Sequence, residues 1–167
     1  MNDVFTKLGL DFKIRFSNRK ILDSLIIFAD IDKNLTKNVL RVIDKLDKQG
    51  LENVLLELGP GRVDTSGDRI DGLNLNRSQI DKLKEFLTLP QGSRAETIES
   101  VDELFKSIAQ KEGLEELKEI NAYLDIFGVS NERAVLDVTI ARGLDYYTGP
   151  VFEAVLNNAT RFGSVMG

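Results

Sequence analysis

The first regular pattern along the chain is an alternation of apolar and polar positions over residues 11–17. A period of two predicts a strand with one buried face. From Asn18 onward the apolar residues follow the spacing of an amphipathic helix, which we expect to run to about Asp30. Ser17 or Asn18 can cap the start of this helix, because both side chains accept hydrogen bonds from backbone amides.

Helical spacing dominates the middle of the chain. Gly50 is expected to end one helix there, because glycine readily adopts the left-handed conformation that follows a helix. Ser100 and Glu103 have the spacing of a capping box and predict the start of another. Residues 59–76 contain four glycines and little apolar periodicity, so a loop is expected there. The predicted helices cover about 34–49, 51–58, 79–89, 101–110 and 114–127.

The period of two returns after Gly128. Residues 135–140 and 151–156 alternate, and the turn residues Thr148-Gly149-Pro150 lie between them. The simplest prediction is an antiparallel hairpin with residues 142–147 at its bend. Ser164-Val165-Met166 suggests one further strand. These strands can bury a face only by pairing with each other and with the first strand.

The expected fold class is therefore α+β, with antiparallel strands interrupted by a mainly helical insertion. We divide the chain into a strand and helix at 1–29, a helical insertion at 30–127 and a hairpin region at 128–167.

Composition narrows the chemistry. The chain is 42% hydrophobic and 29% charged, as expected of a globular protein. Its net charge of -5 argues against coating nucleic acid through bulk positive charge and leaves only a local contact with RNA open. The sequence has no cysteine and no histidine, which excludes disulfides, thiolate zinc sites and imidazole bases. Any chemistry must use Arg, Lys, Tyr, carboxylates or hydroxyls.

The longest apolar run, residues 25–29, is far shorter than the ~20 residues of a membrane-spanning helix. The first residues also lack the basic start and apolar middle of a secretory signal. We therefore expect a cytoplasmic location and no membrane partner.

Three further patterns have both a functional and a purely structural interpretation, and the structural one is favoured for each. The glycines of 59–76 could cradle phosphate, but Asp64 stands where G-x-G-x-x-G requires glycine, and no Walker sequence occurs. The basic residues of 34–49 could contact nucleic acid, but Asp44 and Asp47 lie among them. Acidic residues of the last helix follow one polar face instead of converging, so no metal site is expected; they are Glu115, Glu116 and Glu119.

One segment concentrates candidate chemistry. Residues 142–149 read Arg-Gly-Leu-Asp-Tyr-Tyr-Thr-Gly, and Val-Phe-Glu follows at 151–153. The guanidinium of Arg142 can neutralise a phosphate or carboxylate with forked donors. The phenols of Tyr146 and Tyr147 can stack on a heteroaromatic ring and hydrogen-bond it. On these residues alone, a small-molecule site and a structural hairpin with tyrosines packed on the sheet are equally open.

This segment resembles the signature R-G-L-D-Y-Y-T-G-x-V-F-E of histidyl-tRNA synthetases, a family of class II aminoacyl-tRNA synthetases. Residues 11–22 resemble the strand and helix after motif 2 of that family, and 42–48 a stretch of its helical insertion. The sequence has no counterpart of motif 1, motif 2, the motif 3 arginine or the anticodon-binding domain. The resemblance thus implies an internal fragment of the catalytic domain, with strands of a class II catalytic sheet.

The resemblance also implies roles for single residues. Arg142 would bind the histidine carboxylate and the ATP α-phosphate, stabilising charge as the adenylate forms. Tyr146 and Tyr147 would line the histidine pocket, with the Tyr147 hydroxyl as the partner of the imidazole. Gly143, Asp145 and Gly149 would shape the bend. Pro150 lacks a backbone donor and is expected outside the hydrogen-bonded ladder.

The function implied is that of a histidine-tRNA ligase, which activates histidine with ATP and Mg²⁺ and transfers it to tRNA(His). Such a ligase is expected to be a homodimer, with the tRNA acceptor stem near the insertion. This chain alone is expected to be inactive and to hold no bound cofactor. The alternative is the regulatory subunit of ATP phosphoribosyltransferase, a paralogue that binds histidine as a signal. The intact signature and the long insertion favour the ligase.

Overall fold

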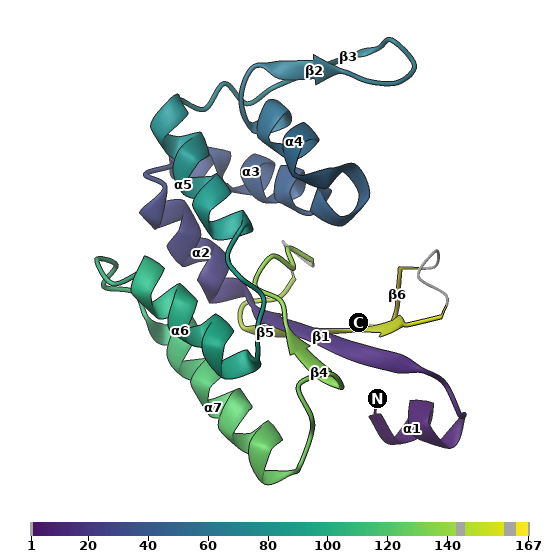
Figure 1. Cartoon of the computed structure of the whole chain (residues 1–167). Helices are drawn as coiled ribbons and strands as arrows, with labels where there is room; N and C mark the ends of the chain where they lie inside the picture. Colours follow the sequence, from purple (N-terminus) through teal and green to yellow (C-terminus); the bar gives the residue numbers. More distant parts are fainter. Residues whose placement is uncertain (1, 143–145, 159–162, 167) are drawn as a thin grey trace.

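A four-stranded mixed sheet forms one side of the molecule (Figure 1). The structure is a computed structural model and describes residues 2–142, 146–158 and 163–166. The strand order is β4-β1-β5-β6, so β1 is an inner strand. It lies antiparallel to β5 and parallel to β4, and β5 is antiparallel to β6. The strands are β1 (Phe12–Asn18), β4 (Ala134–Leu136), β5 (Pro150–Leu156) and β6 (Ser164–Met166).

The predicted hairpin between residues 135–140 and 151–156 is wrong. Both strands instead pair with β1, on its two opposite edges: Arg15 is aligned with Val135 of β4 and with Glu153 of β5. A parallel pair such as β1 and β4 requires a long crossover connection, and the helical segment between them supplies it. β4 and β5 therefore lie on opposite sides of β1 and do not pair with each other.

Pro150 is also placed differently from the prediction. It is the first residue of β5 and is aligned with Asn18, so it lies at the end of the ladder and not outside it. The first position of a strand tolerates proline, because the missing N–H lies where pairing begins.

Helices cover the middle of the chain, as predicted. Asn18 caps α2 by accepting a hydrogen bond from the backbone N of Lys20. Among the described residues, no helix combines the length and apolarity needed to cross a membrane. The helices are α1 (Asn2–Lys7), α2 (Arg19–Phe28), the 3₁₀ turn η1 (Lys33–Leu35), α3 (Thr36–Ile43), α4 (Leu46–Leu58), α5 (Arg77–Leu87), α6 (Arg94–Leu104) and α7 (Glu112–Ile126).

Two helix boundaries differ from the prediction. The segment predicted as one helix over 34–49 divides after Ile43. The predicted break at Gly50 is present as a kink within α4, where Gly50 has a φ of 76° and a non-helical backbone. The capping box of α6 is formed by Ser93 and Glu96, not by Ser100 and Glu103. Both pairs fit the capping pattern, but Ser93 directly follows the break at 90–92, whereas the Ser100 hydroxyl donates to the Glu96 carbonyl inside the helix.

The loop predicted at 59–76 contains a small antiparallel hairpin, formed by β2 (Gly61–Val63) and β3 (Arg69–Asp71). At its base the backbone strands cross closely, since a Cβ added to Gly72 would lie 2.0 Å from the Gly59 carbonyl oxygen. At its tip Asp64 accepts hydrogen bonds from Ser66 and Asp68. Gly61 and Gly72 thus allow close packing of the backbone, which apolar periodicity does not reveal.

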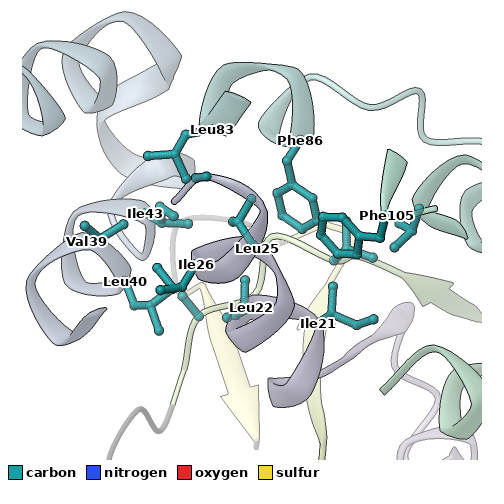
Figure 2. Packing of buried hydrophobic residues seen from close by; sticks show 14 of the residues in the cluster. Ile21, Leu22, Leu25, Ile26, Val39, Leu40, Ile43, Leu83, Phe86 and Phe105 are labelled. Carbon is teal, nitrogen blue, oxygen red and sulfur yellow. The ribbon is translucent and has the colours of Figure 1, made fainter. Parts of the chain in front are cut away.

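Helix α2 lies at the centre of the hydrophobic core (Figure 2). Its buried side chains meet α3 and α5, and the stacked rings of Phe86 and Phe105 extend the core towards α6, with centroids 5.8 Å apart. Phe16 of β1 and Leu136 of β4 belong to the same cluster, so part of the sheet shares this core with the helices. Phe12 and Ala154 pack with Phe5 of α1 in a second, smaller cluster. The labelled residues are Ile21, Leu22, Leu25 and Ile26 of α2, Val39, Leu40 and Ile43 of α3, Leu83 and Phe86 of α5, and Phe105.

Candidate active site

Arg142 lies in the segment that connects β4 to β5, directly after the buried Ala141. Its side chain is half-exposed, and its Nε atom lies 3.1 Å from Oε2 of Glu153. Glu153 is on β5 and only 3% exposed. The contact has the distance of an ion pair without the alignment of a hydrogen bond. The predicted catalytic arginine is therefore attached electrostatically to the sheet.

Arg15 on β1 holds the other oxygen of the same carboxylate. Its Nη1 donates to Oε1 of Glu153 at 2.9 Å, and the two residues are directly aligned across the strands. Its Nε and Nη2 donate to Oδ2 of Asp137 at 3.0 and 2.5 Å. Nη1 also donates to Oδ2 of Asp47, on α4, at 2.7 Å. Arg15 thus joins β5, the residue that follows β4, and one helix.

The surroundings of Arg15 keep it charged. Burial lowers its pKa, but the carboxylates of Asp137 and Asp47 outweigh burial and raise the pKa above its ordinary value. Asp137 is itself held in place by the backbone N and the hydroxyl of Thr139, which donate to Oδ1 at 3.0 and 2.6 Å. Glu153 is therefore a buried carboxylate shared by two arginines, one of them fixed.

A small cavity of about 30 Å³ lies beside this network and is bordered by Arg15, Arg142 and Glu153. It has room for about one water molecule. Ligand sites for small molecules are typically about 300–1,000 Å³, so this cavity cannot hold histidine or ATP. We interpret it as part of the support behind Arg142.

The two candidate tyrosines are not buried. Tyr146 is 83% exposed and Tyr147 is 38% exposed. Their rings pack edge to face, with centroids 5.1 Å apart and an interplanar angle of 89°. This exposure does not fit a hairpin whose tyrosines pack on the sheet. Gly143, Leu144 and Asp145, which complete the motif, lie outside the described residues.

The acidic residues of α7 form ion pairs within this helix and with α2. Glu116 accepts hydrogen bonds from Lys20 and Asn18, and this lowers its pKa, with the Lys20 contact the largest cause. Glu115 pairs with Lys118 on its own helix. Within the part of the chain that the structure describes, no three potential ligands gather into a metal-binding group.

Arg15 and Asp137 were not predicted as site residues from the sequence, and Glu153 was named only as part of a motif. A signal was available for all three, because each occupies a polar position in a segment of otherwise alternating apolar residues. Opposite charges at such positions on adjacent strands can pair across the sheet. Without the strand order, however, the pairing could not be assigned.

Comparison with known sequences agrees with the motif. The family model described as "Histidyl-tRNA synthetase" matches residues 1–162. The "Histidine--tRNA ligase" of Rhizobium rhizogenes is 40% identical over 183 residues, which cover 100% of this chain and 36% of that protein. The protein of the same name from Bartonella henselae is 43% identical over 185 residues, covering 99% of this chain and 36% of the relative.

Solved structures give the same result for the fold. The histidyl-tRNA synthetase of Nostoc sp. PCC 7120 is similar with a TM-score of 0.82 and 29% identity, over 98% of this chain and 36% of that one. A Bacillus halodurans protein described as "ATP phosphoribosyltransferase regulatory subunit/histidyl-tRNA synthetase" has a TM-score of 0.68 at 24% identity, over 95% of this chain and 37% of that one. The second likeness concerns the fold alone.

The signature sequence and these similarities point to the aminoacyl-tRNA synthetases as the class of protein. Within that class, the chain belongs to the histidyl-tRNA synthetase family. It spans 36% of the length of the Rhizobium rhizogenes and Bartonella henselae relatives.

Proposed function

We propose that this chain is part of a histidine-tRNA ligase, which activates histidine with ATP and transfers it from histidyl-adenylate to tRNA(His). The observation that carries the proposal is the complete signature segment, with Arg142 attached to the sheet through Glu153. Relatives named as this ligase, at 40% and 43% identity over the whole chain, support it.

In this proposal Arg142 is the catalytic residue of the chain. It binds the histidine carboxylate and the ATP α-phosphate, and it stabilises the charge that develops as the adenylate forms. Glu153 contacts Nε, which leaves Nη1 and Nη2 of Arg142 for forked recognition of an anion. The half-exposed guanidinium can therefore keep its anchor while it meets substrate.

Tyr146 and Tyr147 line the histidine pocket in this proposal. Their exposure supports it, because phenols that are not packed in the core of the described residues are available to a ligand. The Tyr147 hydroxyl is the partner of the substrate imidazole. A polar group that the substrate must match rejects isosteres that lack it.

ATP is a substrate of the proposed reaction, and Mg²⁺ accompanies it when the full active site is loaded. The described residues contain no convergent acidic group that fits Mg²⁺, so no step of the reaction is assigned to the ion here.

We further propose that residues 1–29 and 128–167 belong to the catalytic domain and that residues 30–127 are its helical insertion. The passage of the chain from β1 to β4 through the helical segment supports this division. The insertion would lie near the tRNA acceptor stem, in a homodimeric cytoplasmic ligase.

The second candidate is a histidine-binding regulatory subunit of ATP phosphoribosyltransferase. The Bacillus halodurans protein, whose description names this function, has a similar fold at 24% identity, and this similarity is the reason to consider the candidate. The intact signature Arg142-Gly143-Leu144-Asp145-Tyr146-Tyr147 favours the ligase.

The deciding experiment uses the full-length protein that carries this chain. Histidine-dependent exchange of pyrophosphate into ATP, together with charging of tRNA(His), is expected of the ligase. Histidine binding without either activity, in a protein that changes the activity of ATP phosphoribosyltransferase, would establish the regulatory subunit instead.

A further inference from the structure

The ion pair between Arg142 and Glu153 has a consequence for catalysis. We propose that Glu153 is a positioning residue that fixes the Arg142 guanidinium for adenylate formation, and that Arg15 in turn fixes Glu153. This inference rests on the proposed ligase function and deepens it. It adds to the reaction two residues that touch no substrate.

The position of Arg142 in the chain creates the need for an anchor. It lies outside the strands, in the connection between β4 and β5, and its side chain is half-exposed. An arginine in such a place loses much rotamer freedom when it binds substrate. An ion pair from Nε to a carboxylate on a strand removes part of that freedom before substrate arrives.

Glu153 is suited to be the anchor because it cannot easily move. Its carboxylate is buried on β5, and Arg15 holds Oε1 from the adjacent strand at 2.9 Å. Arg15 is itself fixed by the two contacts to Asp137. Moving one member of such a network would leave a buried charge unpaired, which costs free energy. The network therefore holds its members in place.

The carboxylate of Glu153 also lies between two like charges, those of Arg15 and Arg142. Without Glu153, the two arginines would repel each other across the cavity that both border.

The test uses the full-length ligase and single-turnover formation of histidyl-adenylate. Glu153→Gln removes the charge but keeps the size of the side chain, and we expect the rate to fall about tenfold to a hundredfold, since misplacement of a catalytic group costs on this order. The KM for histidine is expected to change less than threefold. Glu153→Asp keeps the charge and draws the carboxylate away from Arg142, so it is expected to slow the reaction even if Glu153→Gln fails to fold.

Glu57→Gln is the matched control. Glu57 is also a buried carboxylate shared by two cations, Lys45 and Arg62, but it lies on α4 and not beside Arg142. Its substitution is expected to lower stability and leave adenylate formation unchanged. A fall in rate equal to that of Glu153→Gln would assign both effects to stability and overturn the positioning role.

A double-mutant cycle separates positioning from general support. If Glu153 acts through Arg142, then Glu153→Asp in an Arg142→Ala background lowers the rate no further. An added loss in that background, or a full rate in Glu153→Asp alone, would overturn the proposal while the ligase function stands. A wild-type protein without histidine-dependent exchange would instead overturn the proposed function itself.

Discussion

Nη2 of Arg94 lies 2.6 Å from Oδ1 of Asp125, and this contact joins the start of α6 to the end of α7. The guanidinium is only 2% exposed and also donates to the Asn121 side chain. Its remaining hydrogen bonds go to the backbone carbonyls of Val129, Ser130 and Ala134, the last being the first residue of β4. One side chain therefore connects two helices with an edge strand of the sheet.

Replacing Arg94 is expected to be strongly destabilising. Arg94→Ala removes the hydrogen bonds of a buried guanidinium, including the one to the buried Ala134 carbonyl, and we expect a loss of about 3 kcal/mol in the free energy of unfolding. Arg94→Lys is not expected to restore it, because an ammonium cannot reach partners in the directions of a planar fork. Urea unfolding measures both. The control is Arg77→Ala, an 89% exposed arginine on α5, and equal losses in the two variants would contradict this role.

Gly72→Ala tests whether residues 59–76 are a packed hairpin or a loose loop. The new Cβ would lie 2.0 Å from the Gly59 oxygen and 2.2 Å from the Gly61 nitrogen, so the base of the hairpin must open. Overpacking of this kind typically costs about 1–3 kcal/mol. Gly67→Ala, at the open tip, meets nothing within 4 Å and is expected to cost only the strain of its positive φ. Thermal melting that is unchanged in Gly72→Ala would indicate a loose loop.

The lowered pKa of Glu57 predicts that the free energy of unfolding depends on pH. Burial raises its pKa, but the contacts with Lys45 and Arg62 outweigh burial and lower the pKa below its ordinary value. A group whose pKa is lower in the folded protein contributes stability above its unfolded pKa and loses it as pH falls through the folded value. The contribution of Glu57 is thus expected at pH 7 and lost below about pH 4, near the ordinary pKa of glutamate.

Glu57→Gln isolates this contribution. The variant is expected to be less stable than wild type at pH 7 by about 1–3 kcal/mol, with the difference shrinking towards pH 3. Urea midpoints measured from pH 7 to pH 3 give the comparison, with Glu85→Gln, at an exposed position of α5, as the control. A stability difference that stays constant over this range would show that the charge of Glu57 is not responsible.

Arg142→Ala in the full-length ligase is expected to lower the rate of adenylate formation about a hundredfold to a thousandfold, the usual effect of losing one charge-stabilising donor. Histidine binding should weaken much less. Arg142→Lys is expected to restore only part of the rate, because an ammonium lacks the forked geometry. Single-turnover measurements with and without saturating histidine separate rate from binding, and an alanine variant with a normal rate would exclude the catalytic role.

Tyr147→Phe in the same protein distinguishes a pocket tyrosine from a structural one. Losing a hydrogen bond to the substrate imidazole is worth about 0.5–1.5 kcal/mol, or up to about 3 kcal/mol if a buried polar group is left unpaired. The KM for histidine should therefore rise roughly threefold to a hundredfold, while the KM for ATP and the melting temperature stay the same. A lower melting temperature with normal histidine kinetics would identify Tyr147 as a structural residue.

Much of the local structure could be predicted from sequence. The alternation at 11–17 predicted β1 and the switch to helical spacing predicted α2, because both patterns are properties of neighbouring residues. Asn18 was named as a cap for the same reason. The signature at 142–153 could be recognised without knowledge of the fold, because it is defined by the order of residue types along the chain.

The tertiary structure alone decided which strands pair. The sequence favoured a hairpin between 135–140 and 151–156 because they are neighbours along the chain, yet β1 separates them. Local pattern shows that a segment forms a strand, but partners depend on which edges the rest of the chain leaves open. The hairpin at 61–71 escaped prediction because its short strands bury little and depend on close backbone crossing.

For the candidate site, the residue types were predictable from the sequence, but the contacts between them were not. Arg142, Tyr146 and Tyr147 followed from the sequence, because a motif names residue types in order. The attachment of Arg142 to Glu153 and Arg15 could not follow from it, since these residues are far apart in the chain and meet only because β1 lies between β4 and β5. Electrostatic contacts act over a few ångströms of space, and distance in space is set by the packing of the whole chain.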